Sequence, residues 1–220
     1  MYLGDMRWPE VTEQAGVLLF PLGSCEQHGP HLPLDTDTRI AVAVANRVAS
    51  TRVGVRVAPA VAYGASGEHA AFAGTLSIGS DVLAMVIIEL VRSAGWAQRV
   101  VLVNGHGGNV DGLRSAVRTL TAEGRTLDVW SPTIAGRDAH AGFTETSLML
   151  SIAPELVRME AAEVGATEPI SLLLPTLRSG GVRAVSPNGV LGDPTGATAF
   201  HGRQLLADMV TSLGTVVDRL

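Results

Sequence analysis

The stretch GVLLFPLGSCEQHGPHLPLDTD, residues 16–37, indicates both the fold and a site. Its first seven residues form a short apolar run closed by proline and glycine, which predicts a buried central strand. A cluster of carboxylates and imidazoles follows at once, made up of Glu26, His28, His31, Asp35 and Asp37. Oxygen and imidazole donors at the end of a strand are the ligands that a divalent cation needs. The stretch therefore predicts a metal site at one end of a sheet.

Apolar strands alternate with helical segments along the chain. Further strands are predicted at 55–61, 99–103 and 127–130, and helices at 38–50, 80–94, 110–122, 142–151 and 198–220. This alternation predicts an α/β fold, with a single domain over residues 1–220 and a mostly parallel β-sheet flanked by helices on both faces. Residues 179–198 are rich in glycine and proline, and we expect a long loop or irregular hairpin there.

The composition narrows the classes of partner and compartment. The net charge is −5 and no run of basic residues occurs, which argues against binding to nucleic acid or an anionic membrane. Cys25 is the single cysteine, so an internal disulfide framework is excluded and a reducing compartment is expected. No charged-then-apolar leader opens the sequence, and the longest apolar run, 82–91, is far shorter than the roughly 20 residues of a membrane span. We expect a soluble, cytoplasmic protein.

Polar clusters follow two of the predicted strands. Glu26 and His28 are two positions apart, so they would lie on one face of an extended segment. His106 lies in a glycine-rich loop after the strand at 99–103. Its neighbours Gly107 and Gly108 let the backbone approach a ligand closely and leave peptide N–H groups free at the next helix start. Because ligands bind beyond the carboxyl ends of parallel strands, we expect the two clusters to meet.

A third polar cluster opens another predicted helix. His140 and Glu145 lie near its start, close enough to serve one pocket. A stray histidine and glutamate are usually exposed, but the apolar residues that follow predict a buried helix start, where charges need partners such as a metal ion. Asp37 has two interpretations, as a helix N-cap or as a metal ligand. Glu26 and His28 beside it favour the ligand.

Four motifs, in order along the chain, resemble those of the creatininase (creatinine amidohydrolase) family. They are EQHGPHLP at 26–33, TD at 36–37, NGHGGN at 104–109 and HAGFTETS at 140–147. The resemblance implies a creatininase-like fold and two divalent metal ions in each subunit, zinc or iron(II), with manganese also suitable. It assigns Glu26 and His106 to one ion, His28 and Glu145 to the other, and Asp37 to a bridge between them.

The activity implied by the resemblance is hydrolysis of an amide or peptide C–N bond by metal-activated water. His140 is the candidate general acid that protonates the leaving nitrogen. Supporting or substrate-binding positions are expected for His31, Gly107, Gly108, Asn109, Glu68 and His69. His201, on the last helix, is expected at the surface or in an interface. The resemblance also implies a ring-like homo-oligomer built from dimers.

The expected substrate is a peptide rather than creatinine. The creatinine-cleaving enzymes have a glutamate ligand two residues after the loop histidine, where this chain has Gly108, and Glu145 would replace it. The opening residues YLGD at 2–5, with Trp8-Pro9, look most like the mycofactocin-system branch of the family. That branch trims a modified ribosomal precursor peptide at its C-terminal end, and we expect release of a dipeptide.

Two other functions fit the same residues. One is a hydrolase of a small cyclic amide or a formamide, which would be distinguished by a narrower pocket than the open groove that a peptide needs. The other is a non-catalytic, metal-binding interaction module. The intact set of five donors argues against the second alternative, because a degenerate site would have lost a ligand.

Overall fold

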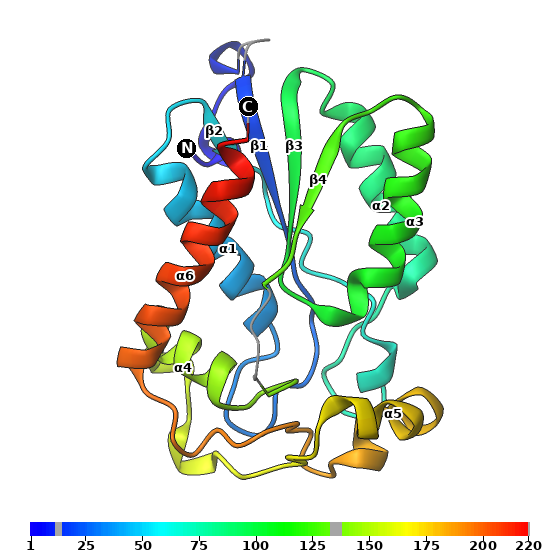
Figure 1. The fold of residues 1–220 in the computed structure, drawn as a ribbon, viewed down its shortest axis with the longest axis vertical. Helices are drawn as coiled ribbons and strands as arrows, with labels where there is room; N and C mark the ends of the chain where they lie inside the picture. The colour runs from blue at the N-terminus through cyan, green and yellow to red at the C-terminus, as the bar shows by residue number, and fades with distance from the viewer. Residues whose placement is uncertain (12–14, 133–137, 220) are drawn as a thin grey trace.

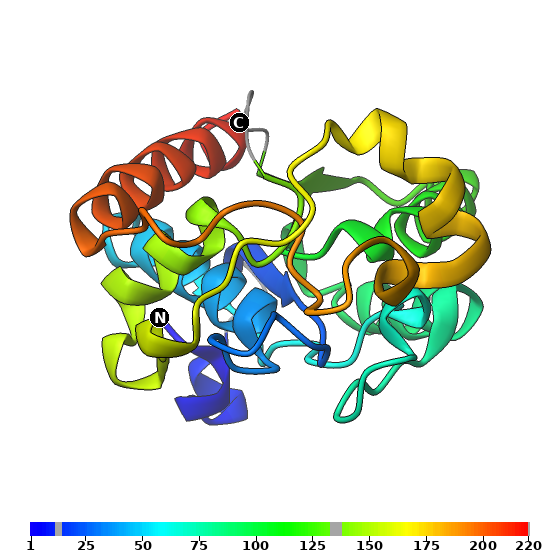
Figure 2. The same cartoon turned by 90° about the horizontal axis from the view of Figure 1, so that it is seen from below.

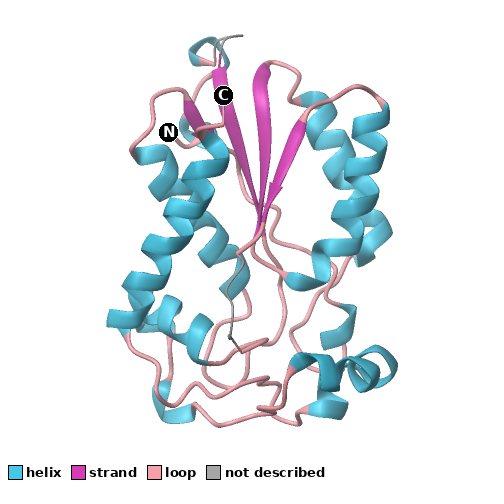
Figure 3. Ribbon diagram, viewed as in Figure 1, coloured by secondary structure: helices cyan, strands magenta, loops and turns pink. Residues whose placement is uncertain are grey.

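The computed structural model describes residues 1–11, 15–132 and 138–219. At its centre is a four-stranded parallel sheet in the order β2-β1-β3-β4 (Figures 1 and 3). The strands are β1 (Ala15–Leu22), β2 (Val55–Val57), β3 (Ala97–Asn104) and β4 (Leu127–Trp130). All three pairings between neighbouring strands are parallel, which confirms the predicted type of sheet.

Helices cover both faces of this sheet. On one face lie α1 (Thr36–Ser50), α4 (Phe143–Ile152) and α6 (Ala199–Val217), and on the other α2 (Gly79–Ser93) and α3 (Val110–Ala122) (Figure 1). Successive side chains of a strand point to opposite faces, and β1 follows this rule. Val17 and Leu19 join the core beneath α1, α4 and α6, whereas Leu18 and Phe20 join the core beneath α2 and α3. Within the described residues, no helix combines the length and the apolar character that crossing a bilayer requires.

Several predicted boundaries differ from the structure by a few residues, and two of these differences matter here. The strand predicted at 55–61 ends at Val57, because Pro59 has no N–H to give to the sheet. The helix predicted from residue 38 begins at Thr36, with Asp35 in the N-cap position. Asp37 is therefore a buried residue of the first turn of α1 and not its cap, which leaves its carboxylate free for another role.

Residues 179–198 do not form one long loop, and that prediction was wrong for their first part. The helix α5 (Ile170–Val185) runs into this stretch with Pro175 inside it, and it is broken at Gly181, where φ is 71°. A Cβ at Gly181 would lie 2.7 Å from the carbonyl oxygen of Glu68, so glycine allows α5 to approach the short turn η3 (Gly67–His69). The glycine that suggested a loop instead marks a kink where helix and turn touch.

The strands β1 and β3 end side by side. Leu22 and Asn104, their last residues, are register partners, and the N–H of Gly105 donates to the carbonyl oxygen of Leu22 at 2.8 Å. The loops after β1 and β3 therefore leave the sheet together at its carboxyl end. Figure 2, the view from below, shows α5 at this end of the molecule.

Candidate metal centre

Five donor side chains gather beyond the carboxyl ends of β1 and β3. Two come from the loop after β1, one each from α1, the loop after β3 and α4: Glu26, His28, Asp37, His106 and Glu145. The first four are buried and Glu145 is half-buried. The structure thus brings together all five residues on which the predicted metal site depends.

Asp37 lies between two imidazole rings. Its Oδ1 is 3.2 Å from His28 Nε2, and its Oδ2 is 3.1 Å from His106 Nδ1. The hydroxyl of Ser24 donates to Oδ2 at 2.8 Å. Two groups of donors near Asp37 could each hold a cation, namely Glu26, Asp37 and His106, and His28, Asp37 and Glu145. Asp37 belongs to both groups, as a bridging carboxylate must.

The carboxylate of Glu26 is fully buried, and neither of its oxygens has an aligned hydrogen-bond donor within the described part of the chain. Three imidazoles surround it. His106 Nε2 lies 3.1 Å from Oε2, while His69 Nε2 and His140 Nδ1 lie 3.3 Å and 3.8 Å from Oε1. A buried carboxylate without such a donor is costly, so a cation at this position fits the residues present.

The charged groups of the site shift one another's pKa values. Burial raises the pKa of Glu26 and of Glu145 to about 7. Burial disfavours a proton on His28 and His106, but Asp37 and the glutamates outweigh it and raise their pKa values to about 10 and about 9. Burial would also raise the pKa of Asp37, yet the same two imidazoles hold it well below its usual range. Without metal, the site therefore holds protons where cations would bind.

A strained turn at Ala141 connects His140 to the helix that carries Glu145. Ala141 has a φ of 52°, in the left-handed region that non-glycine residues rarely adopt, and its N–H donates to Glu145 Oε2 at 2.6 Å. His140 Nε2 lies 2.8 Å from the carbonyl oxygen of Gln27, so this nitrogen carries a proton. Burial holds the pKa of His140 well below its usual value, so the ring is neutral. Its Nδ1 therefore presents a lone pair to the site, 3.8 Å from Glu26 Oε1.

A cavity of about 930 Å³ opens over this site, and three of the five donors, Asp37, His106 and Glu145, line it. Its polar floor is formed by six side chains and two glycines of the site: Asp37, Glu68, His69, His106, His140, Glu145, Gly107 and Gly108. The apolar side chains of Ile170, Leu174 and Leu177 on α5 form another wall. An apolar cavity with a few convergent polar groups is the usual form of a ligand site.

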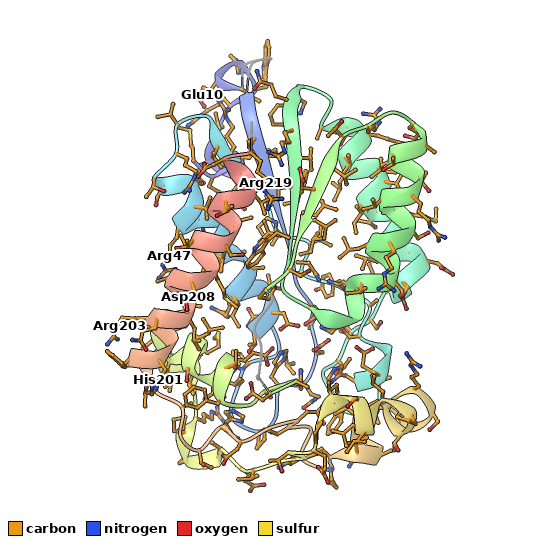
Figure 4. All side chains as sticks on the ribbon, in the orientation of Figure 1. Glu10, Arg47, His201, Arg203, Asp208 and Arg219 are labelled. Carbon is orange, nitrogen blue, oxygen red and sulfur yellow. The ribbon has the colours of Figure 1, made fainter. Side chains whose placement is uncertain are left out.

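Other predicted site residues lie away from the cavity. His31 is buried against α4, with Nε2 2.8 Å from Thr146 Oγ1, and burial lowers its pKa to about 4. Asn109 is buried and donates to the side-chain oxygen of Asn104 at 3.1 Å. Both side chains brace the loops that carry the donors, and neither lines the cavity. His201 lies near the start of α6 and is exposed (Figure 4).

Sequence reasoning missed two residues of the site. Ser24 donates to Asp37, and Gln27 Nε2 lies 2.9 Å from His69 Nδ1 and 3.0 Å from His140 Nε2. Neither residue type binds metals well, so nothing about them suggested a role. The one available signal is their position, because Gln27 lies inside the EQHGPHLP motif between two candidate ligands and Ser24 lies two residues before Glu26.

Known proteins match most of the chain. The family model Creatininase, described as creatinine amidohydrolase, matches residues 4–217. A mycofactocin precursor peptide peptidase from Mycobacterium ulcerans (strain Agy99) is 55% identical over 212 residues, which cover 92% of this chain and 82% of the relative. A creatinine amidohydrolase from Pseudomonas putida is 32% identical over 197 residues, 73% of this chain and 75% of the relative.

Solved structures described as creatininase Mn and as a Zn-Zn type of a creatininase variant both superpose with a TM-score of 0.80. Their identities are 26% and 27%, and each alignment covers 98% of this chain and 96% of the other.

Proposed function

Because the chain belongs to the creatininase family, we propose that it is a two-metal peptidase of mycofactocin biosynthesis, which releases a C-terminal dipeptide from a modified ribosomal precursor. The family and the relatives named as peptidases make the chain a hydrolase of amide bonds. The observation that carries the two-metal part is the position of Asp37. Each of its oxygens faces the imidazole of a different donor group.

The residues present fit two divalent ions. One would be held by Glu26, Asp37 and His106, and the other by His28, Asp37 and Glu145. The buried Glu26 carboxylate, which lacks an aligned donor among the described residues, supports a cation there. Zinc, iron(II) and manganese all accept such ligands, and creatininases of the same fold are described with manganese or zinc. When bound, the ions would supply a water of lowered pKa and polarise the scissile carbonyl.

We assign proton transfer to His140. Its ring is neutral, with the Nε2 proton held by the carbonyl of Gln27 and the Nδ1 lone pair toward the cavity floor. In this state His140 accepts the proton of the attacking water at Nδ1 and then gives it to the leaving nitrogen. It therefore acts as a base before it acts as the general acid. The competing role is ligation, because His140 also forms a donor group with Glu26 and His28.

Two observations support a peptide substrate. The cavity of about 930 Å³ is far larger than a small cyclic amide needs, and its α5 wall offers apolar contacts to side chains beyond the cleaved bond. The relative named a mycofactocin precursor peptide peptidase is 55% identical to this chain, whereas the relative named a creatinine amidohydrolase is 32% identical. The 32% identity to the creatinine amidohydrolase still favours a small cyclic amide as the next candidate substrate.

Mass spectrometry of the products tests the proposal. Metal-loaded protein is incubated without oxygen with the modified precursor peptide, and in parallel with creatinine and a formamide. A released C-terminal dipeptide supports the proposal, while turnover of the small amides alone would replace it with the second function. Two bound metals without turnover of any amide would leave a binding module.

Matched aspartate variants complete this experiment. We expect Asp37→Asn to abolish turnover, because it removes one charged oxygen from the shared ligand. Asp35→Asn is the control, since Asp35 is partly exposed and pairs with Arg39 at 2.7 Å on the surface of α1.

A further inference from the structure

Gln27 is a buried amide between two histidines of the cavity. Its Oε1 accepts the backbone N–H of Gly29 at 2.9 Å. That N–H can only donate, so it fixes which end of the amide is oxygen. The Nε2 group then faces three atoms at 2.9–3.0 Å: His69 Nδ1, His140 Nε2 and the carbonyl oxygen of Gly189.

The two protons on Gln27 Nε2 have only two acceptors among these three atoms. The carbonyl oxygen of Gly189 can only accept, so it takes one proton. His140 Nε2 lies 2.8 Å from the backbone carbonyl oxygen of Gln27, which also can only accept. His140 Nε2 therefore carries its own proton and cannot take another. The second amide proton goes to His69 Nδ1.

This assignment fixes the proton of His69 on Nε2, which lies 3.3 Å from Glu26 Oε1. We propose that Gln27 is a positioning residue, which holds His69 in the tautomer that presents an N–H to Glu26 and thereby orients that carboxylate toward its cation. The presence of a cation rests on the proposed function, whereas the tautomer assignment rests on the hydrogen bonds of Gln27 alone. Burial, which lowers the pKa of His69 to about 3, agrees with a neutral ring.

The opposite tautomer of His69 would oppose metal binding. It would turn a nitrogen lone pair toward the buried carboxylate of Glu26, and two acceptors at this distance repel each other. The contact between His69 Nε2 and Glu26 Oε1 is not aligned as a full hydrogen bond. What matters for Glu26 is therefore whether the facing nitrogen carries a proton or a lone pair, more than the exact direction of the contact. Partners that orient a metal ligand in this way typically change metal affinity by about 10–100-fold.

The surrounding loop is built around this amide. Gly189 has a φ of 82°, and a Cβ there would collide with the Oε1 of Gln27. Asparagine at position 27 would be too short to span from Gly29 to His69, and glutamate would have no proton to donate. Glutamine is thus the side chain that satisfies both neighbours at once.

Correlation NMR of ¹⁵N-labelled protein reads histidine tautomers directly, with and without zinc. We expect His69 to carry its proton on Nε2 in the unmodified protein, and an Nδ1 proton there would overturn the proposal without any variant. In Gln27→Glu, the new carboxylate can only accept, so we expect the His69 proton to move to Nδ1. Zinc affinity, measured by competition with a chelator, should then fall about 10–100-fold.

A double-mutant cycle separates positioning from packing. His69→Ala should weaken zinc binding by a similar factor, and adding Gln27→Glu to it should cause little further loss, because the two residues act in one chain. Full additivity of the two losses would contradict the proposal. Gln27→Met, of similar volume but without a strong donor or acceptor, should lose less affinity than Gln27→Glu. These readouts need no peptide turnover, so a protein that binds zinc but cleaves nothing would contradict the proposed function and leave this inference intact.

Discussion

The carboxylate of Glu68 occupies the space that a side chain at position 108 would need. A Cβ built on Gly108 lies 2.5 Å from Glu68 Oε1, and it would also collide with His106 Nε2 and the carbonyl oxygen of Ala65. The pattern of the creatinine-cleaving enzymes has a glutamate ligand at this position. Here the turn η3 packs against the loop instead, and Glu68 brings its own carboxylate to 3.7 Å from His106 Nε2.

Gly108→Ala is therefore expected to disturb the His106 side of the site. The added methyl group would collide with the backbone oxygen of Ala65 and with the candidate ligand His106. It should therefore lower the free energy of unfolding by about 1–3 kcal/mol, and the protein should lose at least one bound metal ion. Urea unfolding and elemental analysis measure the two effects. Gly107→Ala is the control, because a Cβ at Gly107 has no atom within 4 Å. A Gly108→Ala protein with normal stability and two metals would show that Glu68 moves aside freely.

His140→Ala tests the assignment of proton transfer. We expect metal content to stay near that of the unmodified protein, while kcat falls by roughly 10²–10⁴-fold, the usual contribution of a general acid–base residue. The exposed His201→Ala should change neither quantity. Loss of a metal ion from His140→Ala would instead make His140 a ligand and refute this assignment.

Metal binding is expected to release protons. Without metal, the pKa values of His28 and His106 are raised from 6.5 to about 10 and about 9, so both rings keep their protons above neutral pH. A cation must displace those protons, and apparent affinity therefore rises as pH increases toward 9. It falls in acid, where Glu26 and Glu145, with pKa values of about 7, also become protonated. Calorimetry in two buffers of different ionisation enthalpy counts the protons, and binding without proton release would contradict the described electrostatics.

The apolar wall of the cavity is expected to contribute to peptide binding. Leu174 lines the cavity on α5, whereas Leu172 on the same helix does not and is 70% exposed. Burying a leucine side chain gains about 1.5–3 kcal/mol, so Leu174→Ser should raise KM for the precursor peptide by about tenfold or more, with kcat little changed. Leu172→Ser is the matched control. Equal effects of the two substitutions would remove α5 from the binding site.

The donors could be found from sequence because the geometry of a parallel sheet is general. Glu26, His28 and His106 follow strands, and all strands of such a sheet end at the same edge, whatever their order. Their direct contact depends on a further fact, namely that β1 and β3 are neighbours although β2 lies between them in the chain. The role of Asp37 was ambiguous for a physical reason, since a carboxylate at a helix start is favourable with or without a metal.

The parts of the fold and of the site that the sequence did not predict depend on tertiary contacts. Pro175 and Gly181 are typical of a loop, but α5 is held in place by Arg183, which donates to the carbonyl oxygen of Ala71 at 2.9 Å and lies 5.4 Å from the centre of the Phe72 ring. No local pattern encodes those contacts. The role of Gln27 likewise depends on hydrogen-bond directions set by residues far along the chain, so only the folded structure reveals it.

The claim that two cations share Asp37 is tested most directly by anomalous X-ray diffraction from crystals loaded with zinc or manganese. We predict two anomalous peaks about 3.5–4 Å apart, one beside Glu26 and His106 and the other beside His28 and Glu145, with the Asp37 carboxylate between them. A single peak, or two peaks that do not share Asp37, would contradict the account.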